Sequence, residues 1–390
     1  MREEPIIKKI EVIVYESKIS NVGKDYNTFN MVYEPNSTLV TRNNILRIHT
    51  SNGLIGQYDS VSDNALSDVK TIAQYLIGKN ALSRESIYND TKRGLRHTAM
   101  LGVGVVDICL WDIAGKLYDE PIYKLLGGEK KPLPCYASTL HADENGGLSS
   151  PQDFLDFAIQ CREMGYPAFK VHGWGNARDN LQREIDNVLN LGSGLNNSMD
   201  LMIDPACEIK NFSDTIKLGR ACDEANFFWF EDPFQDGGVS QFAHAKLRQL
   251  IKTPILQTEH IRLLEQHVDF INAGATDFVR AGAHEDGGIT GAMKIAHASE
   301  GFGLDVELHG PGAVHRHIMS SIRNTNYFEL GLVHPNVEYT KPQIYTNYSD
   351  NLDSIDSDGN VFAPDGPGIG VDLDWEWIKK NQVDGGILAE

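Results

Sequence analysis

Three acidic residues end three successive apolar runs of the chain. Asp204 follows Leu-Met-Ile, Glu231 follows Phe-Trp-Phe, and Glu259 closes Ile-Leu-Gln-Thr-Glu, at intervals of 27 and 28 residues (231 − 204 and 259 − 231). That interval fits one β-strand plus one helix, so each acid holds the same place in a repeating βα unit. At one rim of a parallel sheet the carboxylates would repel one another unless a cation lay between them. Oxygen ligands alone favour a hard divalent ion, so the pattern predicts a Mg²⁺ site rather than three unrelated helix-capping acids.

Polar residues on other strands supply the rest of a candidate site. Lys170 and His172 flank Val171, and the period of two along a strand places both on the face opposite Val171, toward the interior of the sheet's curl. His309 and Glu329 lie on later strands. A single histidine in such a position is usually a hydrogen-bonded structural residue. Two histidines and a lysine around a metal favour binding and deprotonation of a carboxylate substrate instead.

These residues lie in a strict alternation of strands and helices that begins at Pro134. The predicted strands are Cys135–Thr139, Ala168–His172, Asp200–Asp204, Phe227–Glu231, Pro254–Glu259, Thr276–Ala281, Leu304–His309 and Tyr327–Leu330. The predicted helices between them are Asp153–Met164, Asp179–Leu191, Asp214–Ala225, Gln241–Ile251, Leu263–Ala273, Gly288–Ser299 and Ala313–Ile322. Eight such units predict an α/β fold, a (β/α)₈ TIM-like barrel with its chemistry at the carboxyl ends of the strands.

The chain before Pro134 has a different pattern. Its first 60 residues predict a β-meander, in which the polar segment Ser17–Thr38 is interpreted as a long loop. Helical periodicity then extends from about Leu66 to Leu117, and Gly102-Val-Gly104 within it indicates helix packing rather than a nucleotide loop. After Gly331 the alternation of strands and helices is lost.

Composition excludes several classes of function. A net charge of −19 argues against partners such as nucleic acid or an anionic membrane surface, and it means that an anionic substrate needs a local positive site. No apolar run is long enough to span a bilayer, and the opening Met1-Arg-Glu-Glu-Pro is too polar for a signal peptide. We therefore expect a cytoplasmic protein whose five cysteines are reduced thiols.

The motifs together resemble the enolase superfamily, in its mandelate racemase and muconate lactonizing enzyme branch, over nearly the whole chain. They are Asp107-Ile-Cys-Leu-Trp-Asp-Ile-Ala-Gly-Lys116, Leu125-Leu-Gly-Gly128, Met202-Ile-Asp204, Glu231-Asp-Pro233, Glu259, Gly287-Gly-Ile-Thr-Gly291 and Pro364-Asp-Gly-Pro-Gly-Ile-Gly370. The resemblance implies an α+β capping domain in residues 1–130, a catalytic barrel in residues 131–330, and a C-terminal segment, 331–390, that packs back on the capping domain. It also implies that Ser17–Thr38 covers the substrate.

The resemblance also implies roles for the site residues. Asp204, Glu231 and Glu259 would bind Mg²⁺. Lys170 corresponds to the first lysine of the family's Lys-x-Lys motif, whose second lysine is here His172. His309 corresponds to the base of the mandelate racemase and sugar-acid dehydratase group. Glu329 corresponds to the acid that hydrogen-bonds the substrate carboxylate.

One position departs from the family pattern. Gly282 stands where relatives carry Asp, paired with the histidine, or Lys. His309 would then lack the carboxylate that orients its ring, unless His284, Glu285 or Asp286 takes that place. Otherwise, proton abstraction depends on His172, or His309 serves as the acid for the leaving hydroxide.

The expected reaction is Mg²⁺-dependent abstraction of the proton α to a carboxylate, through an enediolate. Dehydration of a sugar acid to a 2-keto-3-deoxy acid is favoured. Racemisation or epimerisation of a 2-hydroxy acid is the second choice, and a metal-binding family member without turnover is the third. We also expect a homo-oligomer. The sequence leaves open which sugar acid is the substrate.

Overall fold

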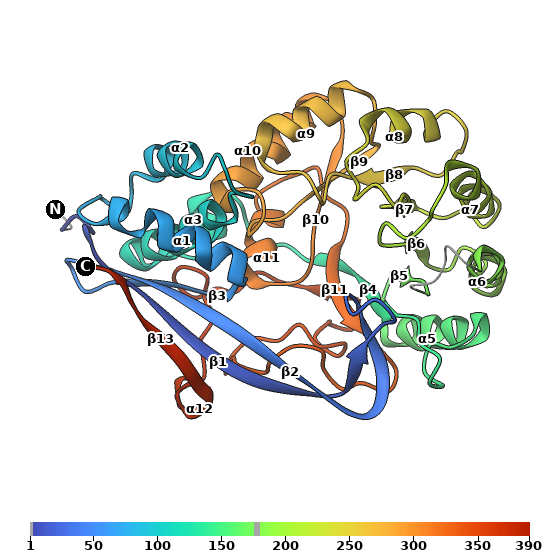
Figure 1. Cartoon of the computed structure of the whole chain (residues 1–390), viewed down its shortest axis with the longest axis horizontal. Coiled ribbons are helices and arrows are strands. Elements are labelled where there is room, and N and C mark those ends of the chain that lie inside the picture. The colour runs from blue at the N-terminus through green and yellow to red at the C-terminus, as the bar shows by residue number, and fades with distance from the viewer. Residues whose placement is uncertain (1–2, 175–179) are drawn as a thin grey trace.

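A curled sheet of parallel strands forms the centre of the protein (Figure 1). The structure is a computed structural model and describes residues 3–174 and 180–390. The strands of the sheet are β4 (Leu133–His141), β5 (Ala168–His172), β6 (Asp200–Asp204), β7 (Trp229–Glu231), β8 (Ile255–Gln257), β9 (Phe278–Ala281), β10 (Asp305–Leu308) and β11 (Phe328–Val333). The strands from β4 to β10 pair in chain order, and β11 pairs with the free side of β4. Glu307 on β10 accepts hydrogen bonds from the backbone N–H groups of Asn326 and Tyr327, which lead into β11. The predicted (β/α)₈ barrel with a capping domain is confirmed.

Helices connect these strands and cover the outside of the barrel. They are α5 (Pro151–Met164), α6 (Leu181–Leu195), α7 (Phe212–Glu224), α8 (Gln241–Leu247), α9 (Leu263–Asn272), α10 (Gly288–Gly301) and α11 (Ala313–Met319). Four of them begin at a side-chain cap that accepts a backbone N–H bond: Ser150, Asn180, Asn211 and Ser240. Within the described residues, no helix combines the length and the apolar character needed to cross a membrane.

Strand alternation divides the barrel into an outer core and a polar interior. On β5, Phe169 and Val171 belong to the large core beneath the helices, as predicted for Val171. Ala168 packs instead in a small inner layer with Tyr136 and Trp229. Lys170 and His172 share the face of Ala168 and lie above that layer, toward the carboxyl ends of the strands.

The capping domain holds both ends of the chain. Its antiparallel sheet consists of β1 (Ile7–Lys24), β2 (Met31–Thr50) and β3 (Ile55–Val61), followed by α1 (Asp63–Leu76), α2 (Arg84–Gly94), α3 (Leu101–Tyr118) and α4 (Ile122–Leu125). The tail contributes α12 (Trp375–Asn381) and β13 (Gln382–Ala389) to this domain, whereas its β12 (Asn360–Val361) pairs with the start of β4 in the barrel. Strand β13 pairs with β1, so the two termini lie side by side (Figure 1).

The interpretation of Ser17–Thr38 as a long loop was wrong. Most of this segment belongs to β1 and β2, which pair almost up to a short turn at residues 25–30. The two strands alternate in burial, and the apolar side chains of Ile19 and Val22 pack against Leu140 of the barrel. Of the polar residues that suggested a loop, Tyr26, Asn27 and Asn30 do lie in the turn, whereas Lys18 and Ser20 are exposed positions of β1. Only the turn therefore approaches the barrel mouth as a loop.

Helix α3 packs closely on the barrel at Gly104, in the segment for which the sequence predicts helix packing. A Cβ on Gly104 would lie 2.7 Å from the carbonyl oxygens of Ala283 and His284. We expect Gly104→Ala to lower the Tm, because about 1–3 kcal/mol of overpacking exceeds the roughly 1 kcal/mol gained in helix propensity. Gly301→Ala is the matched control, since a Cβ there meets no atom within 4 Å. Equal Tm values for both variants in a thermal melt would contradict this close packing.

Candidate active site

The three predicted metal ligands meet at the mouth of the barrel. Asp204 and Glu231 are the last residues of β6 and β7, and Glu259 follows β8 by two residues. One carboxylate oxygen from each lies within 4.8 Å of the others. Burial raises the pKa of Glu259, and the charges of Glu231 and Asp204 add to this shift. Three convergent oxygen donors whose charges oppose one another fit a hard divalent cation such as Mg²⁺.

Two buried cations lie beneath these carboxylates. The Lys170 ammonium is 3.0 Å from Glu231, 3.1 Å from Glu329 and 3.7 Å from Asp204. Arg280 on β9 bonds Glu231 through Nε at 2.7 Å. Burial would lower the pKa of Lys170, yet Glu231 and Glu329 raise it well above its usual value, so the side chain stays a cation. Sequence reasoning missed Arg280, although its place between Val279 and Ala281 on a strand was a usable signal.

One ring nitrogen of His172 forms a hydrogen bond within the protein. Its Nδ1 lies 2.7 Å from the backbone oxygen of Thr139, which can only accept a hydrogen bond, so Nδ1 carries the proton. In the neutral ring the lone pair is therefore on Nε2, which is 3.2 Å from Asp204. The ring of His141, at the end of β4, lies 4.9 Å from that of His172, and burial lowers the pKa of His141 to about 3. His141 was missed because the predicted strand ended two residues too early, at Thr139.

His309 has the carboxylate partner that Gly282 does not supply. Glu285 lies 3.3 Å from Nδ1 of His309, and a Cβ added to Gly282 would lie 2.4 Å from Oε2 of Glu285. Glu285 thus fills the space that a side chain at position 282 would need. On the other side of the ring, Nε2 is 3.3 Å from Glu259. Burial would lower the pKa of His309, but Glu259 and Glu285 raise it to about 10, so the imidazolium is favoured at neutral pH.

Glu329 on β11 is an ionised acceptor in this structure. Besides Lys170, the backbone N–H of Gly310 donates to it at 2.7 Å. Burial would raise the pKa of Glu329, but Lys170 and Arg280 hold it well below its usual range. Its carboxylate orients Lys170, and donation of a proton to a substrate carboxylate would require the substrate's charge to raise that pKa.

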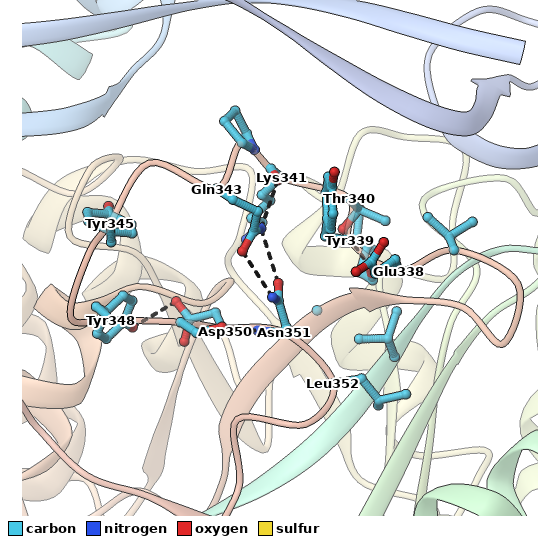
Figure 2. A pocket seen from close by; sticks show the side chains of 16 residues that line it. Glu338, Tyr339, Thr340, Lys341, Gln343, Tyr345, Tyr348, Asp350, Asn351 and Leu352 are labelled. Carbon is cyan, nitrogen blue, oxygen red and sulfur yellow. Dashed lines mark hydrogen bonds between the residues drawn. The ribbon is translucent and has the colours of Figure 1, made fainter. Parts of the chain in front are cut away.

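One pocket of about 490 Å³, a size that suits a small-molecule substrate, is lined by all the predicted site residues except Glu231: Lys170, His172, Asp204, Glu259, His309 and Glu329. The capping domain contributes Asn30, from the turn between β1 and β2, together with Tyr58 and Ser60 of β3. The segment after β11 contributes Lys341, whose surroundings are shown in Figure 2. Asn30 lies in the segment expected to cover the substrate, whereas Tyr58, Ser60 and Lys341 were not singled out from the sequence, because none ends a barrel strand.

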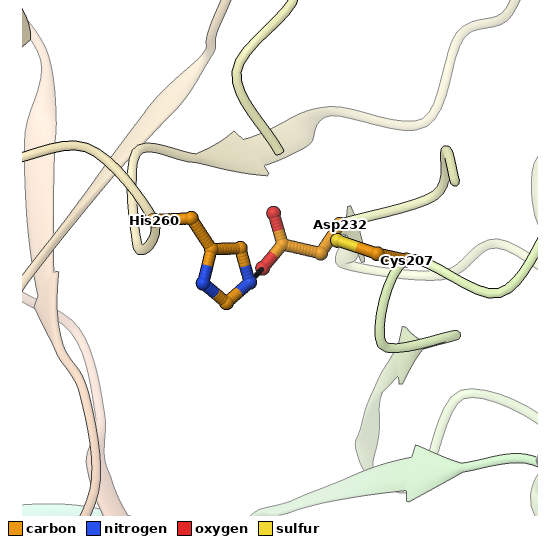
Figure 3. Close-up of side chains that lie close together, drawn as sticks. All are labelled: Cys207, Asp232 and His260. Atoms are coloured by element: carbon orange, nitrogen blue, oxygen red, sulfur yellow. Dashed lines mark ion pairs between the residues drawn. The ribbon is translucent and has the colours of Figure 1, made fainter. Parts of the chain in front are cut away.

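A second cluster lies directly after the ligand-bearing strands. Cys207, Asp232 and His260 bring one potential ligand atom each within 4.8 Å (Figure 3). His260 Nε2 is 2.9 Å from Asp232, and although burial would lower the pKa of His260, this carboxylate raises it to about 10. The cluster therefore holds an imidazolium–carboxylate pair, which joins the two loops that follow Glu231 and Glu259.

We expect Glu285→Gln to reduce kcat/KM about 10–100-fold, the range typical for loss of a partner that orients a functional histidine. Without this carboxylate the pKa of His309 falls, so the alkaline limb of the pH–rate profile moves to lower pH. The double variant Gly282→Asp/Glu285→Ala should recover part of the activity, because it returns a carboxylate to the same space. Glu265→Gln, at an exposed ion pair with Lys92, is the control. An unchanged pH profile in Glu285→Gln would contradict the pairing.

Comparisons with known proteins agree with this geometry. The mandelate racemase / muconate lactonizing enzyme N-terminal domain matches residues 32–127, and the enolase C-terminal domain-like family matches residues 153–377. Arabinonate dehydratase of Saccharolobus solfataricus is 24% identical over 342 residues, which cover 84% of this chain and 87% of that protein. N-succinyl-L-Arg/Lys racemase of Bacillus cereus is 22% identical over 355 residues, 87% of this chain and 90% of that one.

A solved structure extends the match to the whole fold. D-glucarate dehydratase from Agrobacterium tumefaciens, crystallised with magnesium, superposes with a TM-score of 0.84 at 27% identity, covering 98% of this chain and 100% of that one. The relatives are dehydratases and racemases, which supports an enzyme. With family matches over both the capping region and the barrel, the chain belongs to the mandelate racemase and muconate lactonizing enzyme branch of the enolase superfamily.

Proposed function

We propose that the protein is a Mg²⁺-dependent sugar-acid dehydratase, which removes the proton α to a carboxylate and expels the β-hydroxyl to give a 2-keto-3-deoxy acid. The observation that carries this proposal is the different environment of the two histidines in one pocket. His172 bonds a carbonyl through Nδ1 and has one carboxylate, Asp204, near Nε2, whereas His309 lies between two carboxylates. A dehydratase needs such a difference, since one group must accept a proton and the other must donate one.

The metal ligands and Lys170 stabilise negative charge on the substrate carboxylate. Mg²⁺ held by Asp204, Glu231 and Glu259 would supply a Lewis acid that stabilises the negative charge developing on the substrate carboxylate. Lys170 adds a fixed positive charge beneath the same carboxylate.

The histidines move the protons. His172 accepts the α-proton at Nε2, the nitrogen that faces the pocket, while Thr139 holds Nδ1–H in place. The enediolate left behind expels the β-hydroxyl, which takes a proton from the His309 imidazolium and leaves as water. The resulting enol then loses its O–H proton and gains a proton at C3, which gives the 2-keto-3-deoxy acid. Glu285 stabilises that imidazolium even when a cation offsets the charge of Glu259.

Racemisation is the second candidate, because β5 and the end of β10 present two histidines to the same pocket. A racemase requires each histidine to act as base in one direction. The two carboxylates around His309 favour its charged form and hence the role of acid, so dehydration fits better. A metal-binding protein without turnover fits less well, since Glu285 supplies the carboxylate that Gly282 does not.

The test is a screen of aldonic and aldaric acids with the Mg²⁺-loaded enzyme. We expect 2-keto-3-deoxy product, detected as a semicarbazone, from at least one stereoisomer. Recovery of a starting acid epimerised at C2, without keto product, would replace dehydration by racemisation. A complete library with neither outcome would contradict both reactions.

A further inference from the structure

Lys341 is a cation at the pocket mouth that the reaction outlined above does not use. It lies eight residues after the end of β11 and lines the same pocket as His172 and His309. Figure 2 shows it next to Gln343, whose side-chain amide donates to the Lys341 backbone oxygen at 3.0 Å. That bond fixes the backbone of the segment and leaves the ammonium group available to the pocket.

The ammonium of Lys341 has no partner of opposite charge. In residues 3–174 and 180–390, no carboxylate lies within 4.0 Å of its Nζ. Lys170, the other lysine of this pocket, has three carboxylates within that distance. The side chain of Lys341 is also exposed, so its charge is accessible to a ligand that enters the pocket.

The carboxylates nearest to Lys341 are already occupied. Asp350, Glu329 and Asp59 attract it electrostatically. Each has a closer donor of its own: Arg316 for Asp350, Lys170 for Glu329 and the Tyr345 hydroxyl for Asp59. The positive charge of Lys341 is thus left for a group that enters the pocket.

We propose that Lys341 binds a second anionic group of the substrate, and hence that the substrate class is the aldaric acids, which carry a carboxylate at each end. This inference rests on the proposed function. The reacting carboxylate belongs beside Lys170 and the metal ligands, at the carboxyl ends of the barrel strands. Lys341 comes instead from the tail segment, and it is attracted by Asp59, which lies between the pocket residues Tyr58 and Ser60 of the capping domain.

The net charge of the protein makes a local cation necessary for a doubly charged substrate. The chain has a net charge of −19, so a dianion approaches only if local cations compensate for the repulsion. An aldonic acid ends in a hydroxymethyl group and would leave the ammonium without a counter-charge. The terminal carboxylate of an aldaric acid forms a charge-assisted hydrogen bond to Lys341 and neutralises it.

The decisive experiment compares matched acids that differ only at C6: galactarate with D-galactonate, and D-glucarate with D-gluconate, within the full stereoisomer library. We expect the wild-type enzyme to prefer the diacid in kcat/KM. Lys341→Met, which keeps the apolar stem and removes the charge, should reduce that preference at least tenfold, mainly through KM. Lys341→Arg should retain most of it. Lys217→Met, at an exposed ion pair on α7, is the control.

A binding measurement separates this inference from the proposed reaction. The diacid is titrated calorimetrically into the Mg²⁺-loaded His309→Asn variant, with and without Lys341→Met, and we expect Kd to rise at least tenfold in the double variant. A wild-type preference for aldonic acids, or an equal Kd in both variants, would overturn the role of Lys341 and leave dehydration intact. Tight, Lys341-dependent binding without turnover of any acid would instead overturn the proposed reaction alone.

Discussion

His309→Asn is expected to lose formation of the 2-keto-3-deoxy product by about 10²–10⁴-fold, because it removes the proton donor for the leaving hydroxyl. The same variant should still exchange the substrate α-hydrogen in D₂O, since His172 and its Thr139 contact are intact. Exchange is followed by NMR, and product by a keto-acid assay on the same samples. Asparagine keeps a polar side chain of similar reach, so a shared circular dichroism spectrum and Tm would show that the fold is retained.

The matched variant His172→Asn should lose both product formation and α-hydrogen exchange, because the base itself is absent. The opposite pattern, with exchange lost in His309→Asn and kept in His172→Asn, would reverse the two roles. Normal turnover in both variants would mean that the acid–base pair lies elsewhere. Lys170 would then be examined first, although Glu231 and Glu329 hold it as a cation.

The metal ligands could be predicted from sequence because their placement is a local pattern. Each acid ends an apolar run, and the repeat of strand and helix fixes where the end of each run lies in space. The period of two along a strand likewise placed Lys170 and His172 on a common face. No long-range contact had to be known, only the period of a strand and the parallel order of the barrel.

The partner of His309 could not be fixed in this way. Glu285 was one of three alternatives, and it reaches His309 because the N–H groups of Glu285 and Asp286 bond back to the oxygen of Gly282. That turn folds the side chain of Glu285 over the glycine. The register of such a turn depends on hydrogen bonds that close only in the folded chain, so residue counting leaves it open.

The strands β1 and β2 were missed for a different reason, because composition conceals their pattern. Polar residues, among them four asparagines, outnumber apolar ones in Ser17–Thr38, and composition alone predicts a loop. Ser17 and Ile19 are buried and alternate with the exposed Lys18 and Ser20, but the burial of Ile19 depends on its contact with Leu140 of the barrel. Lys341 was missed for a related reason, since it lies outside every periodic element and its position depends on how the tail packs.

Removal of divalent ions with EDTA is expected to abolish turnover, and Mg²⁺ should restore it. Without a bound cation, Asp204, Glu231 and Glu259 oppose one another, while Lys170 and Arg280 compensate mainly Glu231. Mg²⁺ should therefore also raise the Tm, since a ligand at 100 times its Kd stabilises the folded state by about 2.7 kcal/mol. Asp204→Asn should weaken this thermal shift and the calorimetric affinity for Mg²⁺, whereas the exposed Glu265→Gln should change neither. Full activity after EDTA treatment would contradict the need for a metal, and an equal Mg²⁺ affinity in Asp204→Asn would contradict the assignment of this ligand.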